Sequence, residues 1–195
     1  AATMGAGAAV LVASAIQVVR DPPGLAWLAL FAMACVAGAA VVRMRGFPAS
    51  FSPSEAVTIT AALVFGPAAG ALCVAGDTLA SSLGLSRPHR TPTTLLFNVT
   101  VPPLAMWLAA HLFVWMTRLG PFAGPPRVES IVLPLAVFAT VYFLLNSGLV
   151  AGAITIGREA RFGRVWREHF APLWLTHFGG TSVAGLLLLF MTAGL

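Results

Sequence analysis

The sequence contains no lysine and few charged residues of either sign. Charged side chains make up 9% of its 195 residues, whereas a typical soluble domain has about 25%. Apolar residues make up 58%, and the mean hydropathy is +0.91. The eleven basic residues are all arginines and lie in short connections, so no clustered basic face for nucleic acid is visible. These values exclude an ordinary soluble domain and indicate a protein surrounded by lipid, with arginines at the headgroups.

Motifs for catalysis are absent as well. The chain has no HExxH, GxSxG, P-loop or CxxC pattern, and no pair of acids or cluster of histidines suited to chemistry. Its two cysteines, Cys35 and Cys73, lie inside apolar runs, where a buried apolar role is more common than a disulfide. We therefore expect a protein that is not an enzyme.

Long apolar runs are what the chain does contain. Residues 170–195 include no charged side chain, and about 20 apolar residues suffice for a helix to cross the roughly 30 Å hydrocarbon core. The expected helices cover roughly residues 3–19, 25–42, 55–83, 93–117, 129–156 and 170–194. The sequence thus predicts an all-α, polytopic transmembrane helical bundle of about six spans, forming a single integral membrane domain over residues 1–195.

The third of these runs, 55–83, is too long for one simple span. Gly66 and Pro67 interrupt it, and a proline removes a backbone donor and disfavours helix at the preceding residue. We expect either one kinked helix or a half-helix over 55–65 followed by a helix over 67–83. Broken helices in membranes often line a cavity.

The connection 157–169 reads GREARFGRVWREH, with apolar residues among four arginines. This pattern is typical of a short amphipathic helix at the membrane surface. With six spans, this connection lies on the side that holds seven of the eleven arginines. The positive-inside rule then puts it in the cytoplasm and both chain ends outside.

Polar residues at membrane depth are candidates for function because lipid does not solvate them. Asp77 is either a ligand contact or proton site, or an acid at a helix end near Arg87 or Arg90. Asn98 and Asn146 either bind a ligand or join two helices.

His111 and His177 are the two histidines within apolar runs. A neutral imidazole can ligate haem or chlorophyll, but no further metal-ligating residue occurs at a suitable spacing. The alternative is a hydrogen-bonded core or interfacial histidine. We predict no metal and no cofactor, and we retain His177 as a ligand-binding candidate.

Small residues recur at helical spacing in two places. Gly5, Ala9 and Ala13 form a stripe on the first helix, and Gly148 and Gly152 form a GxxxG pair on the fifth. Such faces let a neighbouring helix or a protein partner approach closely. The first stripe is also explained by a helix that is simply rich in alanine.

The segments FGPAAGALCVAGDTLASSL and VYFLLNSGLVAGAITIGREARFGRVWREHF carry a resemblance. The first resembles the substrate-binding S components of energy-coupling-factor vitamin transporters. Both are similar to the six-helix membrane sensor domains of bacterial HD-phosphohydrolase, diguanylate cyclase and histidine kinase proteins. The resemblance implies a ligand cavity between helices, with Asp77, Asn98 and Asn146 near it or stabilising it, and a partner-binding face at Gly5, Ala9 and Ala13.

From these observations we expect a membrane domain that binds a small ligand or a partner and relays the bound state through its helices. The expected location is the bacterial inner membrane, crossed several times. Two alternatives stay open: an accessory structural subunit of an energy-converting or photosynthetic complex, and a vitamin-uptake S component.

Overall fold

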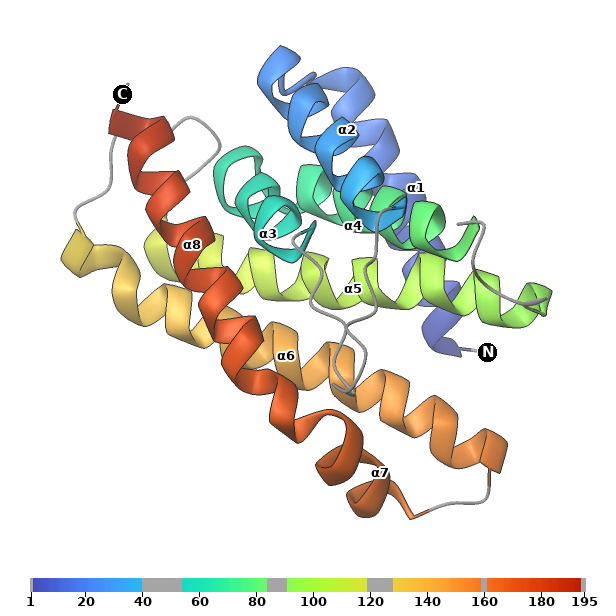
Figure 1. Cartoon of the computed structure of the whole chain (residues 1–195). Coiled ribbons are helices and arrows are strands. Elements are labelled where there is room, and N and C mark those ends of the chain that lie inside the picture. The colour runs from blue at the N-terminus through green and yellow to red at the C-terminus, as the bar shows by residue number, and fades with distance from the viewer. Residues whose placement is uncertain (1, 40–53, 84–90, 119–127, 159–160, 194–195) are drawn as a thin grey trace.

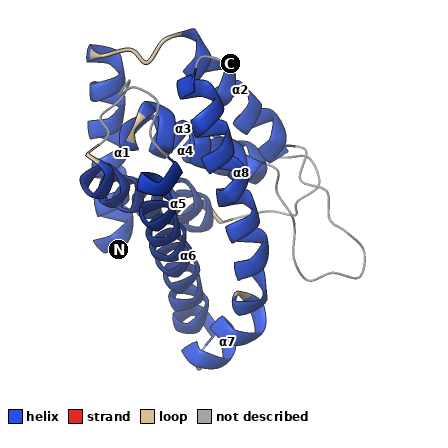
Figure 2. Cartoon of the chain, turned by 90° about the vertical axis from the view of Figure 1, so that its left-hand side faces the viewer, coloured by secondary structure: helices blue, strands red, loops and turns tan. Residues whose placement is uncertain are grey.

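The computed structural model describes residues 2–39, 54–83, 91–118, 128–158 and 161–193 (Figure 1). Within these ranges the chain is helical and contains no strand (Figure 2). The helices are α1 Ala2–Arg20, α2 Leu25–Ala39, α3 Ser54–Phe65, α4 Pro67–Leu83, α5 Pro92–Thr117, α6 Val128–Arg158, α7 Phe162–His169, the 3-10 turn η1 Ala171–Leu173 and α8 Trp174–Ala193. The predicted all-α helical bundle is confirmed.

Four segments of the described chain are long and apolar enough to cross a membrane. They are Ala2–Arg20, Pro92–Thr117, Val128–Gly157 and Phe162–Met191, whereas α2 and α3 are shorter apolar helices. Large apolar side chains point outward from the bundle, among them Ile156, which is 86% exposed. Such a surface is costly in water and favourable in lipid, so the chain has the character of a helical membrane protein.

The break in the third run produces two separate helices. Helix α3 ends at Phe65, and α4 begins at Pro67, where the missing amide hydrogen of proline costs nothing. Gly66 between them has a φ of +91°, in the left-handed region that favours glycine. Helix α4 then packs back along α3, since a Cβ atom on Gly70 would collide with Ala62. The second of the two sequence alternatives is therefore correct, and the two helices form a hairpin.

Helix α3 occupies the centre of the bundle. It contacts α2, α4, α5 and α8, and eight of its twelve residues are buried. One apolar cluster joins it to α4, α5, α6 and α8, and a second joins it to α2 and α4. At 1.5 Å per residue, α3 is only about 18 Å long, too short to cross the bilayer alone.

The hairpin also changes how the membrane spans are counted. The start of α1 lies at the same end of the bundle as α7, while the end of α8 lies at the opposite end (Figure 1). The expectation that both ends share one side of the membrane counted the run 55–83 as a single span, and it stays a prediction. Arg87 and Arg90, which supported that count, lie outside the described residues, as do Arg43, Arg45 and Arg127.

The remaining helices follow the sequence closely. Helix α5 starts behind the cap Thr91, whose hydroxyl accepts from the Thr94 amide, and it continues through Pro102 and Pro103. The predicted amphipathic helix is present as α7, with Val165 buried and its two arginines, Arg164 and Arg167, exposed. Helix α7 and η1 connect the end of α6 to the start of α8.

Candidate functional site

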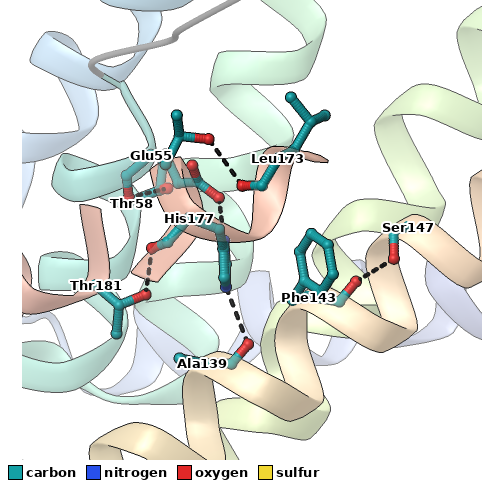
Figure 3. A network of polar contacts seen from close by, with 9 residues as sticks. Glu55, Thr58, Ala139, Phe143, Ser147, Leu173, His177 and Thr181 are labelled. Carbon is teal, nitrogen blue, oxygen red and sulfur yellow. Dashed lines mark hydrogen bonds and ion pairs between the residues drawn. The ribbon is translucent and has the colours of Figure 1, made fainter. Parts of the chain in front are cut away.

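A buried histidine and an acid join three helices at the centre of the molecule. The Nδ1 atom of His177, on α8, lies 2.5 Å from Oε1 of Glu55, on α3. Its Nε2 atom lies 3.0 Å from the carbonyl oxygen of Ala139, on α6 (Figure 3). The imidazole thus links segments that are 122 and 38 residues away in sequence. It is the only contact with ion-pair geometry within the described part of the chain.

The contacts of His177 determine how many protons the pair holds. A backbone carbonyl only accepts hydrogen bonds, so Nε2 must carry a hydrogen and donate it to Ala139. One further proton then lies between Nδ1 and Oε1 of Glu55. It is held either as imidazolium and carboxylate or as imidazole and carboxylic acid. Both forms are neutral overall, which lowers the cost of placing the pair away from water.

Local sequence positions both side chains. Glu55 lies in the first turn of α3, where the helix dipole favours a negative charge, and its carbonyl oxygen accepts from Thr58 at 3.0 Å. His177 lies one turn into α8, and its carbonyl oxygen accepts from Thr181 at 2.9 Å. The side chain of His177 is 5% exposed, whereas the side chain of Glu55 is 34% exposed. Glu55 is therefore the accessible member of the pair.

The exposed part of Glu55 faces a cavity of about 160 Å³. The cavity lies between the start of α3, the middle of α6 and the turn that leads into α8. Its polar wall is formed by Glu55, Asn146, Ser147, Thr176 and His177. Its apolar wall is formed by Phe143, Val150, Phe170 and Leu173. In the bilayer this is a polar chamber inside an apolar bundle, which is where a membrane protein holds polar ligands.

Asn146 brings an unsatisfied group to this chamber. Its Oδ1 atom is buried and has no hydrogen-bond partner. A buried carbonyl oxygen without a donor costs about 1–3 kcal/mol, so such an atom calls for a partner from outside the chain. This places one sequence candidate, Asn146, beside another, His177.

The surface helix α7 is hydrogen-bonded to the α6 side of the cavity wall. Nε1 of Trp166 donates to Oγ of Ser147 at 2.9 Å, and the hydroxyl of Ser147 donates to the Phe143 carbonyl at 2.6 Å. The rings of Phe143 and Trp166 meet edge to face with centroids 6.2 Å apart. A displacement of this wall would therefore move the amphipathic helix.

Asp77 lies outside the cavity but close to it. It sits on α4 against α2, where Gly38 has no side chain and leaves room for the carboxyl group. The Ser54 hydroxyl donates to this carboxyl group, and Oδ1 has no partner. Asp77 and Glu55 thus lie on either side of the first residue of α3, and Asp77 contributes an acid near the site without lining it.

Two other candidates lie apart from the cavity. Asn98 lies on α5, which contributes no residue to the cavity wall, and is partly buried. His111, also on α5, is exposed, and its Nδ1 pairs with the Trp107 carbonyl oxygen at 2.9 Å. Both ring nitrogens of His177 are occupied, which leaves neither to ligate haem or chlorophyll. No group of three or more metal-ligating side chains occurs among the described residues.

Within the described residues, no helix packs closely on the small-residue faces. Gly5, Ala9 and Ala13 are exposed, and α1 instead buries Gly7 and Ser14. Cβ atoms on Gly148 and Gly152 would meet no atom within 4 Å. Both faces therefore point to the surroundings of the bundle.

A larger groove of about 410 Å³ runs between α6 and α8. Apolar side chains such as Ile131, Leu135 and Leu186 dominate its lining, and no charged residue lines it. Lipid chains fill grooves of this kind, so we place the candidate site in the smaller polar cavity.

The residue that sequence reasoning missed as a site candidate is Glu55. An acid in the first turn of a helix is explained by the helix dipole alone, so this position by itself gives no reason to single out Glu55. The signal that points to it is an acid at the start of an apolar helix that is followed by a glycine–proline break. Its partner is 122 residues away, so no local pattern reveals the pair.

The comparisons with known proteins give no identification. No protein-family model, curated protein or solved structure matches this chain.

Proposed function

We propose that this protein is a non-enzymatic, multi-pass membrane domain that binds a small ligand in the cavity between α3, α6 and α8. The observation that supports this most is the polar wall of that cavity. The wall around this space of about 160 Å³ includes the partly exposed carboxyl group of Glu55 and the residue Asn146, whose buried Oδ1 atom has no hydrogen-bond partner. Polar groups in lipid are costly, and an unpaired set around a space is best explained by a bound partner.

The relay would follow from the contacts of the wall. A ligand at Glu55 touches the side chain that joins α3 to α8, and a ligand at Ser147 touches the group that holds Trp166 on α7. Ligand binding would therefore bias the position of the surface helix relative to the bundle. The exposed arginines of α7 favour a cytoplasmic location for it, in the inner membrane of a bacterium.

Native mass spectrometry of the full chain, extracted gently from its own membranes, tests this proposal. A chain that carries one small molecule supports it and identifies the ligand. Glu55→Gln should reduce the bound fraction, whereas Glu129→Gln, an exposed acid in the first turn of α6, should not. A chain that is always empty, or an unchanged bound fraction in Glu55→Gln, would reject the cavity.

An accessory structural subunit of a larger membrane complex is the second candidate. Its support is the outward face at Gly5, Ala9 and Ala13, which no helix of this chain covers in the described residues. Partner subunits in a fixed ratio in the same mass spectrum would favour it. The third candidate, a vitamin-uptake S component, has less support, because about 160 Å³ is below the roughly 300–1,000 Å³ of pockets for drug-sized molecules.

A further inference from the structure

We infer that the cavity between α3, α6 and α8 binds a small uncharged molecule, such as a short-chain carboxamide, whose polar group both donates and accepts a hydrogen bond. This inference rests on the proposed ligand-binding function and names the chemical class of the ligand. It follows from a donor and an acceptor of the wall that have no partner in the described chain, and from the neutrality of the pair that lines the cavity.

Asn146 supplies the donor. Its Oδ1 atom is buried, so the NH₂ group is the part of the side chain that is open to the cavity, and this group has no partner among the described residues. An amide NH₂ group only donates, so it requires an acceptor on the ligand. The hydroxyl donors of the wall are already used, since Ser147 donates to the Phe143 carbonyl at 2.6 Å and Thr176 donates to the Leu173 carbonyl at 2.8 Å.

Glu55 supplies the acceptor. Its Oε1 atom shares a proton with Nδ1 of His177, whereas Oε2 is open and has no partner in the described part of the chain. The shared proton stays at Oε1, so Oε2 accepts in both forms of the pair, as an oxygen of a carboxylate or as the carbonyl oxygen of a carboxylic acid. The ligand must therefore bring a donor to Glu55 as well as an acceptor to Asn146.

The charge of the wall favours neither an anion nor a cation. The Glu55–His177 pair is neutral overall, no arginine is among the described lining residues, and Asp77 lies behind Ser54 without lining the cavity. An ion would lose its hydration here without a net opposite charge to replace it. An ammonium ion would also leave the NH₂ group of Asn146 without an acceptor, and a carboxylate would leave Oε2 of Glu55 without a donor.

A carboxamide meets both requirements with one rigid polar group. Its NH₂ group donates toward Glu55 and its carbonyl oxygen accepts from Asn146, and it carries no charge near neutral pH. The apolar part of the wall, which includes Phe143, Phe170 and Leu173, accommodates a short alkyl tail. The volume of about 160 Å³ limits the ligand to a few carbon atoms, because pockets for drug-sized molecules measure roughly 300–1,000 Å³.

Ligand-observed saturation-transfer NMR on the full chain in nanodiscs tests this inference, with empty nanodiscs as the blank for probes that enter the lipid. Four probes of similar size separate the hydrogen-bonding classes. Propionamide donates and accepts, butanone only accepts, propylammonium is a charged donor, and propionate is a charged acceptor. We expect propionamide to bind, and the other three to bind at least about tenfold more weakly, because each leaves one group of the wall unpaired.

Two substitutions remove the donor and the acceptor separately, so the test does not depend on the folding of one variant. Asn146→Leu should weaken propionamide binding about tenfold, whereas Asn98→Leu, on α5 away from the cavity, should leave it unchanged. Glu55→Leu should weaken it at least as much, whereas Glu129→Leu, at an exposed acid in the first turn of α6, should not.

Each other outcome overturns the inference in a distinct way. Tighter binding of propylammonium or propionate would reject an uncharged ligand and leave the ligand-binding cavity standing. Equal binding of butanone and propionamide would show that no donor is needed at Glu55. Propionamide binding that is equal in all four variants would place it on the lipid surface. Failure of all four probes overturns the inference too, and the native mass spectrum then decides separately whether the cavity holds another ligand.

Discussion

Helices α1 and α3 are both apolar, yet they occupy opposite environments. Helix α1 has 19 residues, and only Gly7 and Ser14 are buried. Its outer face carries the exposed side chains of Val12, Ile16 and Val19. Helix α3 has 12 residues, of which eight are buried. Apolarity therefore does not decide which helix lies inside a membrane bundle, because lipid is as apolar as the core.

Polar content distinguishes the two helices instead. The buried face of α3 includes three hydroxyl residues, Ser54, Thr58 and Thr60, while α1 buries one, Ser14, together with Gly7. The hydroxyl groups of Thr58 and Thr60 donate to backbone carbonyls of their own helix at 3.0 and 2.7 Å. Since lipid offers no hydrogen bonds, a helix that carries hydroxyl groups and an acid is more stable when protein surrounds it.

Disruption of the α3–α4 hairpin, which places α3 inside the bundle, should have the largest effect on this difference between the helices. Gly70→Leu should lower the free energy of unfolding by more than about 3 kcal/mol, since even a Cβ atom there collides with the backbone of Ala62. Gly148→Leu, with no atom within 4 Å of its Cβ position, is the matched control. Unfolding in mixed micelles by a denaturing detergent measures both. Similar stability in the two variants would contradict the hairpin.

Loss of the Glu55–His177 pair, which joins α3 to α8, should have the second-largest effect on stability. His177→Leu should cost about 2–3 kcal/mol, below the 3–5 kcal/mol of a fully buried pair because a third of Glu55 is exposed. The double variant Glu55→Leu/His177→Leu should recover much of this loss, because no uncompensated polar group is left behind. The same unfolding measurement completes the double-mutant cycle. Losses that simply add would show that the two side chains act independently.

The connection of α7 to the cavity wall should have a smaller effect. Trp166→Phe retains the ring but removes the hydrogen bond to Ser147, at a cost of about 1 kcal/mol. Trp115→Phe, at a tryptophan that is 75% exposed, is the control and should change the unfolding free energy by less than about 0.5 kcal/mol. Equal losses in both variants would mean that α7 is not held by this bond.

The outer helix should tolerate change best. Gly5→Leu should alter the unfolding free energy of the isolated chain by less than about 0.5 kcal/mol, since its Cβ position meets no atom within 4 Å. If partner subunits accompany the chain in its own membrane, the same variant should release them, as seen by native mass spectrometry. Destabilisation of the isolated chain would instead mean that this face packs within the protein.

The sequence predicted most of the helices and part of the site. Charge-free runs and the break at Gly66–Pro67 are local features, so the helix ends and the two-helix alternative were found from them. Asn146 and His177 were found because polar residues stand out in an apolar sequence, and the structure brings both to one cavity. Asn98 met the same criterion and lies elsewhere, since periodicity does not reveal which neighbour a helix face meets.

What the sequence determined by itself is the class of the molecule: an all-α chain with the composition of a membrane protein, because length and apolarity are properties of each helix alone. Only the tertiary structure decided that α3 lies inside and α1 outside, that α3 and α4 fold back on each other, and that Glu55 meets His177. These features depend on contacts between residues up to 122 positions apart in the sequence. The hairpin turn at Gly66 brings such residues together, and polar groups away from water favour the arrangement that gives them hydrogen-bond partners.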